Sequence, residues 1–160
     1  MLKKAGTAIL VCTMALLAVG ITGCGGSNEK PRAADNEIML VIKLDLKEDI
    51  GLLVIDHVLD GNEGSGGVSN ADRSMIKRDD TLYWTFDKRN YDDPSDTVDL
   101  TLRFTVVTEY CDPNYDNIYP EEFMIPIEAV SFSADFGGTY CVTIAGDKTD
   151  GYHTVLNERE

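Results

Sequence analysis

Histidine, tryptophan and basic side chains are scarce in this chain of 160 residues. There are 2 histidines, 1 tryptophan and 14 lysines and arginines against 28 aspartates and glutamates, which gives a formal net charge of −14 at neutral pH. A surface of this sign repels phosphate backbones, and no local cluster of Lys and Arg offsets the repulsion. We therefore expect no nucleic-acid partner, and we expect cations or basic partners to suit the surface better.

The common motifs of catalytic and cofactor sites are also missing. The chain has no Gly-x-Ser-x-Gly elbow, no His-Glu-x-x-His, no Cys-x-x-Cys and no Walker-type phosphate loop. His57 and His153 stand in or beside strand-like segments, where packing and surface roles are commoner than catalysis. No two of the many carboxylates stand out as an acid–base pair. We assign no catalytic residue and no cofactor, and an envelope hydrolase that uses acidic residues is the alternative.

The first residues of the chain have the parts of an export signal. Lys3 and Lys4 precede an apolar run from Ala5 to Ile21, and small residues follow before Cys24. A plain secretory signal and an uncleaved anchor are the alternatives, but polar residues within the run weaken it as a membrane-spanning helix. The sequence therefore favours cleavage after Gly23.

The last four residues of this segment carry a resemblance to a known class of protein. Ile21-Thr22-Gly23-Cys24 resembles the lipobox of bacterial lipoproteins, whose cysteine receives a diacylglycerol and becomes the new N-terminus. The resemblance implies a signal peptide over residues 1–23, lipid on Cys24, and attachment to the cell membrane or cell surface outside the cytoplasm. Two or more acyl chains hold a protein firmly, whereas one is marginal.

The rest of the chain is long enough for one domain. Residues 25–36 are small and polar without an apolar period, which predicts a flexible tether behind the lipidated Cys24. We expect a single domain over residues 37–156 and a short polar tail over 157–160.

Within that domain the hydrophobic period is two almost throughout. The clearest case is residues 98–106, where Val98, Leu100 and Leu102 share a face with Phe104 and Val106. The glycine-rich stretch from residue 60 to 80 predicts a loop, and Pro126 predicts a sheet edge or a break. The expected strands are 40–46, 50–59, 81–86, 98–106, 123–127, 129–134, 139–145 and 152–156.

Many short strands around one core predict an all-β fold, an antiparallel β-sandwich with immunoglobulin-like architecture. Trp84 on an early strand, followed by Cys111 and Cys141, faintly resembles the packing of immunoglobulin domains. In antibody domains the cysteines flank the tryptophan, so the likeness is one of architecture. A small β-barrel is the alternative fold.

Cys111 and Cys141 are an even pair of cysteines in a domain that we expect to be exported. An oxidising compartment permits a disulfide between them. Two buried thiols are the other interpretation, because free cysteine packs as a small apolar residue.

One segment, from Tyr110 to Glu122, gathers acids and tyrosines. Asp112, Asn114 and Asp116 match the first three alternate ligand positions of an EF-hand calcium loop. The glycine and the bidentate glutamate of that loop are absent, so an ordinary turn is the alternative interpretation. These three residues are our candidate calcium ligands.

Two tyrosines of the same segment, Tyr115 and Tyr119, are the candidate ligand contacts, because exposed aromatic rings bind sugars and protein surfaces at low entropic cost. We expect a non-catalytic binding or structural module, joined to the membrane through Cys24, whose partner is an extracellular protein or glycan.

Overall fold

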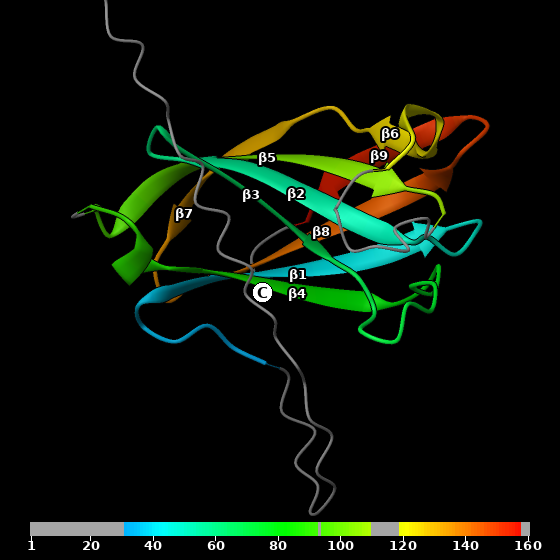
Figure 1. Ribbon diagram of the computed structural model, residues 1–160. Helices are drawn as coiled ribbons and strands as arrows, with labels where there is room; N and C mark the ends of the chain where they lie inside the picture. Colours follow the sequence, from blue (N-terminus) through cyan, green and yellow to red (C-terminus); the bar gives the residue numbers. More distant parts are fainter. Residues whose placement is uncertain (1–30, 93, 110–118, 158–160) are drawn as a thin grey trace, which may run out of the picture.

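The computed structural model describes residues 31–92, 94–109 and 119–157 (Figure 1). Within these ranges the chain forms nine strands and two short 3-10 helices. The strands are β1 (Glu37–Leu46), β2 (Leu52–Leu59), β3 (Asn62–Val68), β4 (Thr81–Asp87), β5 (Thr97–Val107), β6 (Met124–Pro126), β7 (Val130–Asp135), β8 (Thr139–Asp147) and β9 (Gly151–Leu156), and the helices are η1 (Lys88–Asn90) and η2 (Glu121–Phe123).

The strands form two sheets that pack face to face. One sheet has the order β4-β1-β8-β9, and the other has β3-β2-β5, with β6 and β7 both paired to β5. All pairs are antiparallel except β1 and β8, which run parallel from Met39 beside Thr139 to Leu46 beside Gly146. The predicted antiparallel sandwich with immunoglobulin-like architecture is confirmed. The sheets do not close on each other, so the alternative of a small barrel is wrong.

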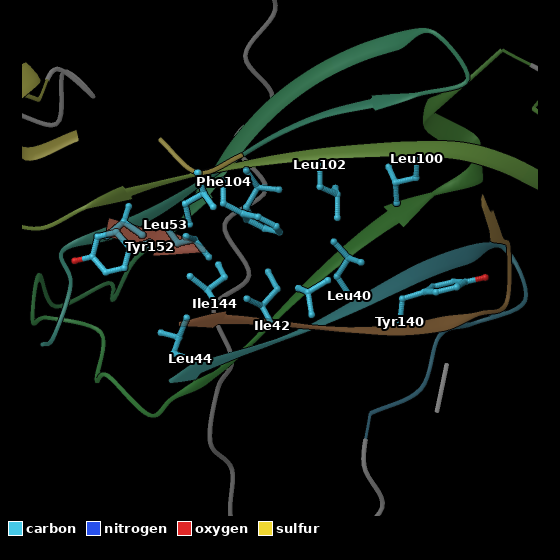
Figure 2. Packing of buried hydrophobic residues seen from close by; sticks show 14 of the residues in the cluster. Leu40, Ile42, Leu44, Leu53, Leu100, Leu102, Phe104, Tyr140, Ile144 and Tyr152 are labelled. Carbon is cyan, nitrogen blue, oxygen red and sulfur yellow. The ribbon is translucent and has the colours of Figure 1, made fainter. Parts of the chain in front are cut away.

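The core lies between the sheets and comes from the predicted alternation (Figure 2). Val98, Leu100, Leu102, Phe104 and Val106 of β5 are each at most 1% exposed. Alternate residues of β1 and β8 meet them from the other sheet. Each such side chain stabilises the fold by about 1.5–3 kcal/mol relative to exposure, which explains why the strict period of β5 predicts its position so well.

The prediction of a loop from residue 60 to 80 is wrong in its first part. Asp60 and Gly61 have positive φ angles of 47° and 81°, so they form a tight hairpin turn in which Leu59 pairs with Asn62. Strand β3 then follows β2 as far as Val68 beside Leu53. The remainder, after Val68, is the expected loop.

Pro126 lies on a sheet edge, as predicted. Strand β6 has three residues and ends its sheet, with Pro126 opposite Thr105 of β5. A proline is tolerated there because an edge strand leaves some backbone donors without a ladder partner.

The sandwich has two ends. At the end that we call proximal, β1 begins at Glu37, with Asp87 of β4 and Thr139 of β8 near its first residues. At the end that we call distal, β1 finishes at Leu46 and β5 finishes at Val107 beside Met124 of β6. Figure 1 shows the proximal end on the left and the distal end on the right.

Candidate functional site

Most of the site residues predicted from the sequence lie outside the described residues. These are Cys24, Cys111, Asp112, Asn114, Tyr115 and Asp116. With Glu109, the segment from Tyr110 to Glu122 makes up what we call segment 109–122; the residues that flank it, Thr108 and Phe123, are described and meet at the distal end. The backbone N–H of Thr108 donates to the carbonyl of Phe123 at 2.9 Å. The described tyrosine of this segment, Tyr119, is half-buried.

The last residues of the predicted tether contact the proximal end. The N–H of Ala33 donates to Thr139 Oγ1 at 3.3 Å, and Asn36 Nδ2 donates to Asp87 Oδ1 at 3.1 Å. The carbonyl of Asn36 accepts from the N–H of Lys88 at 2.8 Å. These bonds fix where the chain enters the domain, so a free tether would end near residue 32.

A buried carboxylate organises the turn between β8 and β9 at the distal end. Asp147 is 6% exposed; its Oδ1 accepts from the N–H groups of Thr149 and Asp150 at 2.8 Å, and its Oδ2 accepts from Lys47 Nζ. The bond from Lys47, with help from the two amides, lowers the pKa of Asp147 to about 2. This carboxylate ties the β1–β2 connection to the β8–β9 hairpin.

Other described carboxyls with perturbed pKa values also have partners that stabilise the anion. Lys77 lowers the pKa of Asp49, Arg89 lowers that of Asp87 to about 2, and Lys88 lowers that of Asp96. A general acid for glycoside hydrolysis needs a raised pKa, so these carboxyls are suited to ion pairing. Among the described residues no group of three or more His, Cys, Asp and Glu side chains is placed to hold a metal ion.

Cys141 on β8 is buried, and among the described residues it has no disulfide partner. It is 2% exposed, and Asn157 Nδ2 lies 3.5 Å from its sulfur. Its predicted disulfide partner, Cys111, is outside the described residues. The residue on either side, Tyr140 and Val142, belongs to the core cluster, so Cys141 points to the outer face of its sheet.

Cys141 belongs to an apolar patch on that outer face. Met39 and Val41 lie beside it on β1, with exposures of 8% and 9%. The patch is flanked by Tyr83 on β4, which is 43% exposed, and by Val155 on β9, which is 47% exposed. Tyr83 therefore presents an aromatic ring to solvent from a strand.

A second cluster, of aromatic rings and glycines, lies at the side of the sandwich where the edge strands β3 and β4 approach each other. The rings of His57 and Phe86 meet edge to face, with centroids 4.9 Å apart. His57 Nε2 lies 3.4 Å from the hydroxyl of Tyr91. Trp84 Nε1 and His57 Nδ1 are buried and have no hydrogen-bond partner among the described residues.

Strand β3 closes over this cluster because two of its inward positions, 64 and 66, are glycines. A Cβ atom at Gly64 would lie 2.5 Å from His57 Cε1 and Nε2, and one at Gly66 would lie 2.4 Å from Trp84 Cη2. The sequence reasoning missed this arrangement because it took the glycines as signs of a loop. The signal that could have found it is the Asp60-Gly61 dipeptide directly after a strand, which is typical of a hairpin.

None of the described segments forms a helix that is both long enough and apolar enough to cross a membrane. This is a finding about the described ranges alone.

No protein-family model matches this chain, and no characterised protein matches its sequence. Among solved structures, it is similar to a disulfide-locked mutant of intermedilysin with human CD59, at 12% identity and a TM-score of 0.38. That match covers 76% of this chain and 24% of the other. For pneumolysin the values are 9% and 0.34, with 76% and 23% covered. The chain thus spans about a quarter of these proteins, and a likeness this low carries no argument about function.

Proposed function

We propose that the chain is a lipid-anchored, extracytoplasmic lipoprotein whose β-sandwich is a non-catalytic binding module. Support for the anchor comes from the lipobox residues Ile21 to Cys24 behind a basic and apolar leader. With lipid on Cys24, residues 25–32 would link the membrane to the contacts that Ala33 and Asn36 make with the proximal end.

The observation that carries the proposal is that the described residues bordering the tether and those bordering segment 109–122 lie at opposite ends of the sandwich. The chain enters at the proximal end, where β1 begins, whereas Thr108 and Phe123, which flank the acidic, tyrosine-rich segment, are bonded at the distal end. Strand β1 has 10 residues, and at about 3.3 Å per residue it spans about 33 Å. A module anchored at one end would hold segment 109–122 away from the bilayer.

Four of the described carboxylates have structural partners and are poor candidates for the general acid of a hydrolase. Asp49, Asp87, Asp96 and Asp147 each have a lysine or arginine partner that lowers the pKa. Such groups stay ionised and hold the structure together, whereas a catalytic acid is kept protonated near neutral pH.

The partner would meet segment 109–122, where Asp112, Asn114 and Asp116 alternate with Tyr115 and Tyr119 follows. Oxygen ligands at that spacing suit calcium, and tyrosine rings suit a protein or glycan surface. Calcium-dependent binding of an extracellular protein or glycan is the form of the function that these residues favour.

The experiment that tests the proposal changes the lipid acceptor. We expect Cys24→Ala to abolish labelling by a fatty-acid probe and to shift the protein from the membrane fraction to the soluble fraction or to an uncleaved precursor. Cys12→Ala, within the leader, is the matched control and should be labelled like the wild type. Equal labelling of the Cys24→Ala variant and the wild type would exclude a lipoprotein.

A further inference from the structure

The imidazole of His57 is half-buried among uncharged groups. On β2 it faces inward, opposite Leu102 of β5. Gly64 of β3 and Phe86 of β4 contact its ring, and the hydroxyl of Tyr91, which follows η1, lies 3.4 Å from Nε2. The backbone at Gly64 approaches so closely that a methyl group there would fall 2.5 Å from two ring atoms. His57 is half-buried and its Nδ1 is fully buried, so a proton added to this ring puts a charge where part of its water shell is replaced by uncharged groups.

Few titratable groups act on that ring. Asp56, its neighbour on β2, favours the charged form, and Tyr91 is the titratable side chain that contacts the ring from another element. The contacts from β3, β4 and β5 are Gly64, Phe86 and Leu102, which carry no charge. Burial outweighs the attraction of Asp56 and the interaction with the Ile55 backbone, which both favour the charged ring, and it lowers the pKa of His57 below its usual value of 6.5.

Strand β3, which covers the ring, is weakly held by side chains. It is an edge strand, and of its seven residues Asn62–Val68 only Val68 is an apolar side chain packed on the core. Its inward positions 64 and 66 are glycines that rest on His57 and Trp84. Elements with few buried apolar contacts open at low free energy, so we expect β3 to detach more readily than the core strands.

We propose that protonation of His57 releases strand β3 from the side of the sandwich and exposes more of the half-buried Trp84 ring to solvent. The neutral ring of His57 packs against Gly64. The charged imidazolium is more stable in water, so it moves outward, and to do so it must displace the backbone of β3. Gly66 sits on the indole two residues along the same strand, so lifting β3 from His57 also uncovers Trp84. The closed arrangement is stable above the pKa of an exposed histidine and loses stability as pH falls below about 6.5.

The single tryptophan of the chain provides the readout. The full chain, kept in a mild non-ionic detergent, is titrated from about pH 7.5 to about pH 5, a range that avoids most carboxyl titration. We expect a reversible red shift of the Trp84 emission with a midpoint below 6.5. Over the same range, amide exchange of residues 62–68, corrected for its intrinsic pH dependence, should rise several-fold while β8 stays protected.

Three variants keep the test specific. His57→Gln removes the titrating group and should abolish the transition, whereas His153→Gln, at the exposed histidine of β9, should retain it. Gly64→Ala, which pushes β3 off the ring, should show the red-shifted emission already at neutral pH with β8 still protected. The proposal is overturned if the wild type shows no transition above about pH 5, if His57→Gln keeps it, or if β8 and β3 lose protection together.

Discussion

Gly66 of β3 lies against the six-membered ring of the Trp84 indole on β4, so closely that a Cβ atom at position 66 would lie 2.4 Å from Cη2. The two strands are edges of different sheets. This contact, together with that of Gly64 on His57, closes one side of the sandwich without large side chains from β3. The shape of this side therefore depends on the absence of side chains at two positions.

The contact predicts that Gly66→Ala destabilises the domain. The added methyl group must displace a ring that packs against the core, and overpacking of this kind costs about 1–3 kcal/mol. Urea unfolding measures the change. Gly67→Ala is the matched control, because its nearest neighbour is the flexible end of Leu52 at 2.9 Å, so we expect a smaller loss. Equal losses in the two variants would contradict a specific role for the indole contact.

A second prediction concerns acid stability and Asp147. Its pKa is about 2 in the folded protein against a usual value of 3.8, so its stabilising contribution is complete above the unfolded value and is lost as pH falls toward 2. Asp147→Asn should therefore lower stability at neutral pH and flatten the decline in acid, as measured by urea unfolding across that range.

The neighbouring Asp150 provides the control. Its carboxylate also approaches Lys47, at 3.8 Å, but its side chain is 81% exposed. Exposed ion pairs contribute little, so Asp150→Asn should leave the acid dependence nearly unchanged. A variant at Asp150 that matched Asp147→Asn would show that overall charge, and not the bonds at the turn, sets the acid dependence.

The sequence predicts the core strands well and the side of the sandwich poorly, for physical reasons. In β5 the residues from Val98 to Val106 alternate because one face must be buried, and burial leaves a strong period in the sequence. Strand β3 has no such period, since His57 and Trp84 fill the space where its side chains would be. The parallel pairing of Met39 with Thr139 joins residues 100 apart and depends on both sheets being formed.

The candidate site shows the same limit. The composition of segment 109–122 points to oxygen ligands and aromatic contacts. The strands predicted on either side of it, 98–106 and 123–127, correctly indicate that its flanking residues lie beside a sheet. That Thr108 and Phe123 meet at the end opposite the start of β1 follows only from the strand order. The fit of Gly64 on His57 depends on the register between β2 and β3, which no local pattern encodes.

Calcium should stabilise the domain if Asp112, Asn114 and Asp116 bind it. A ligand at 100 times its dissociation constant adds about 2.7 kcal/mol to the free energy of unfolding. We expect thermal unfolding in millimolar calcium to occur at higher temperature than in EDTA, and we expect Asp112→Ala to remove the difference. Asp92→Ala, an exposed acid of the β4–β5 connection, should keep it. No shift in the wild type would leave Tyr115 and Tyr119 as the residues to test next.

The most direct test of the proposed function measures how the sandwich stands on the membrane. A fluorophore is attached through Asp35→Cys at the proximal end or Glu122→Cys at the distal end, both exposed positions. Cys111 is changed to Ser in both proteins. Each lipidated protein is then placed in vesicles whose lipid headgroups carry a quencher. The account predicts strong quenching of the probe at residue 35 and weak quenching of the probe at residue 122. Equal quenching of the two probes, or stronger quenching at residue 122, would contradict the presentation of segment 109–122 away from the bilayer.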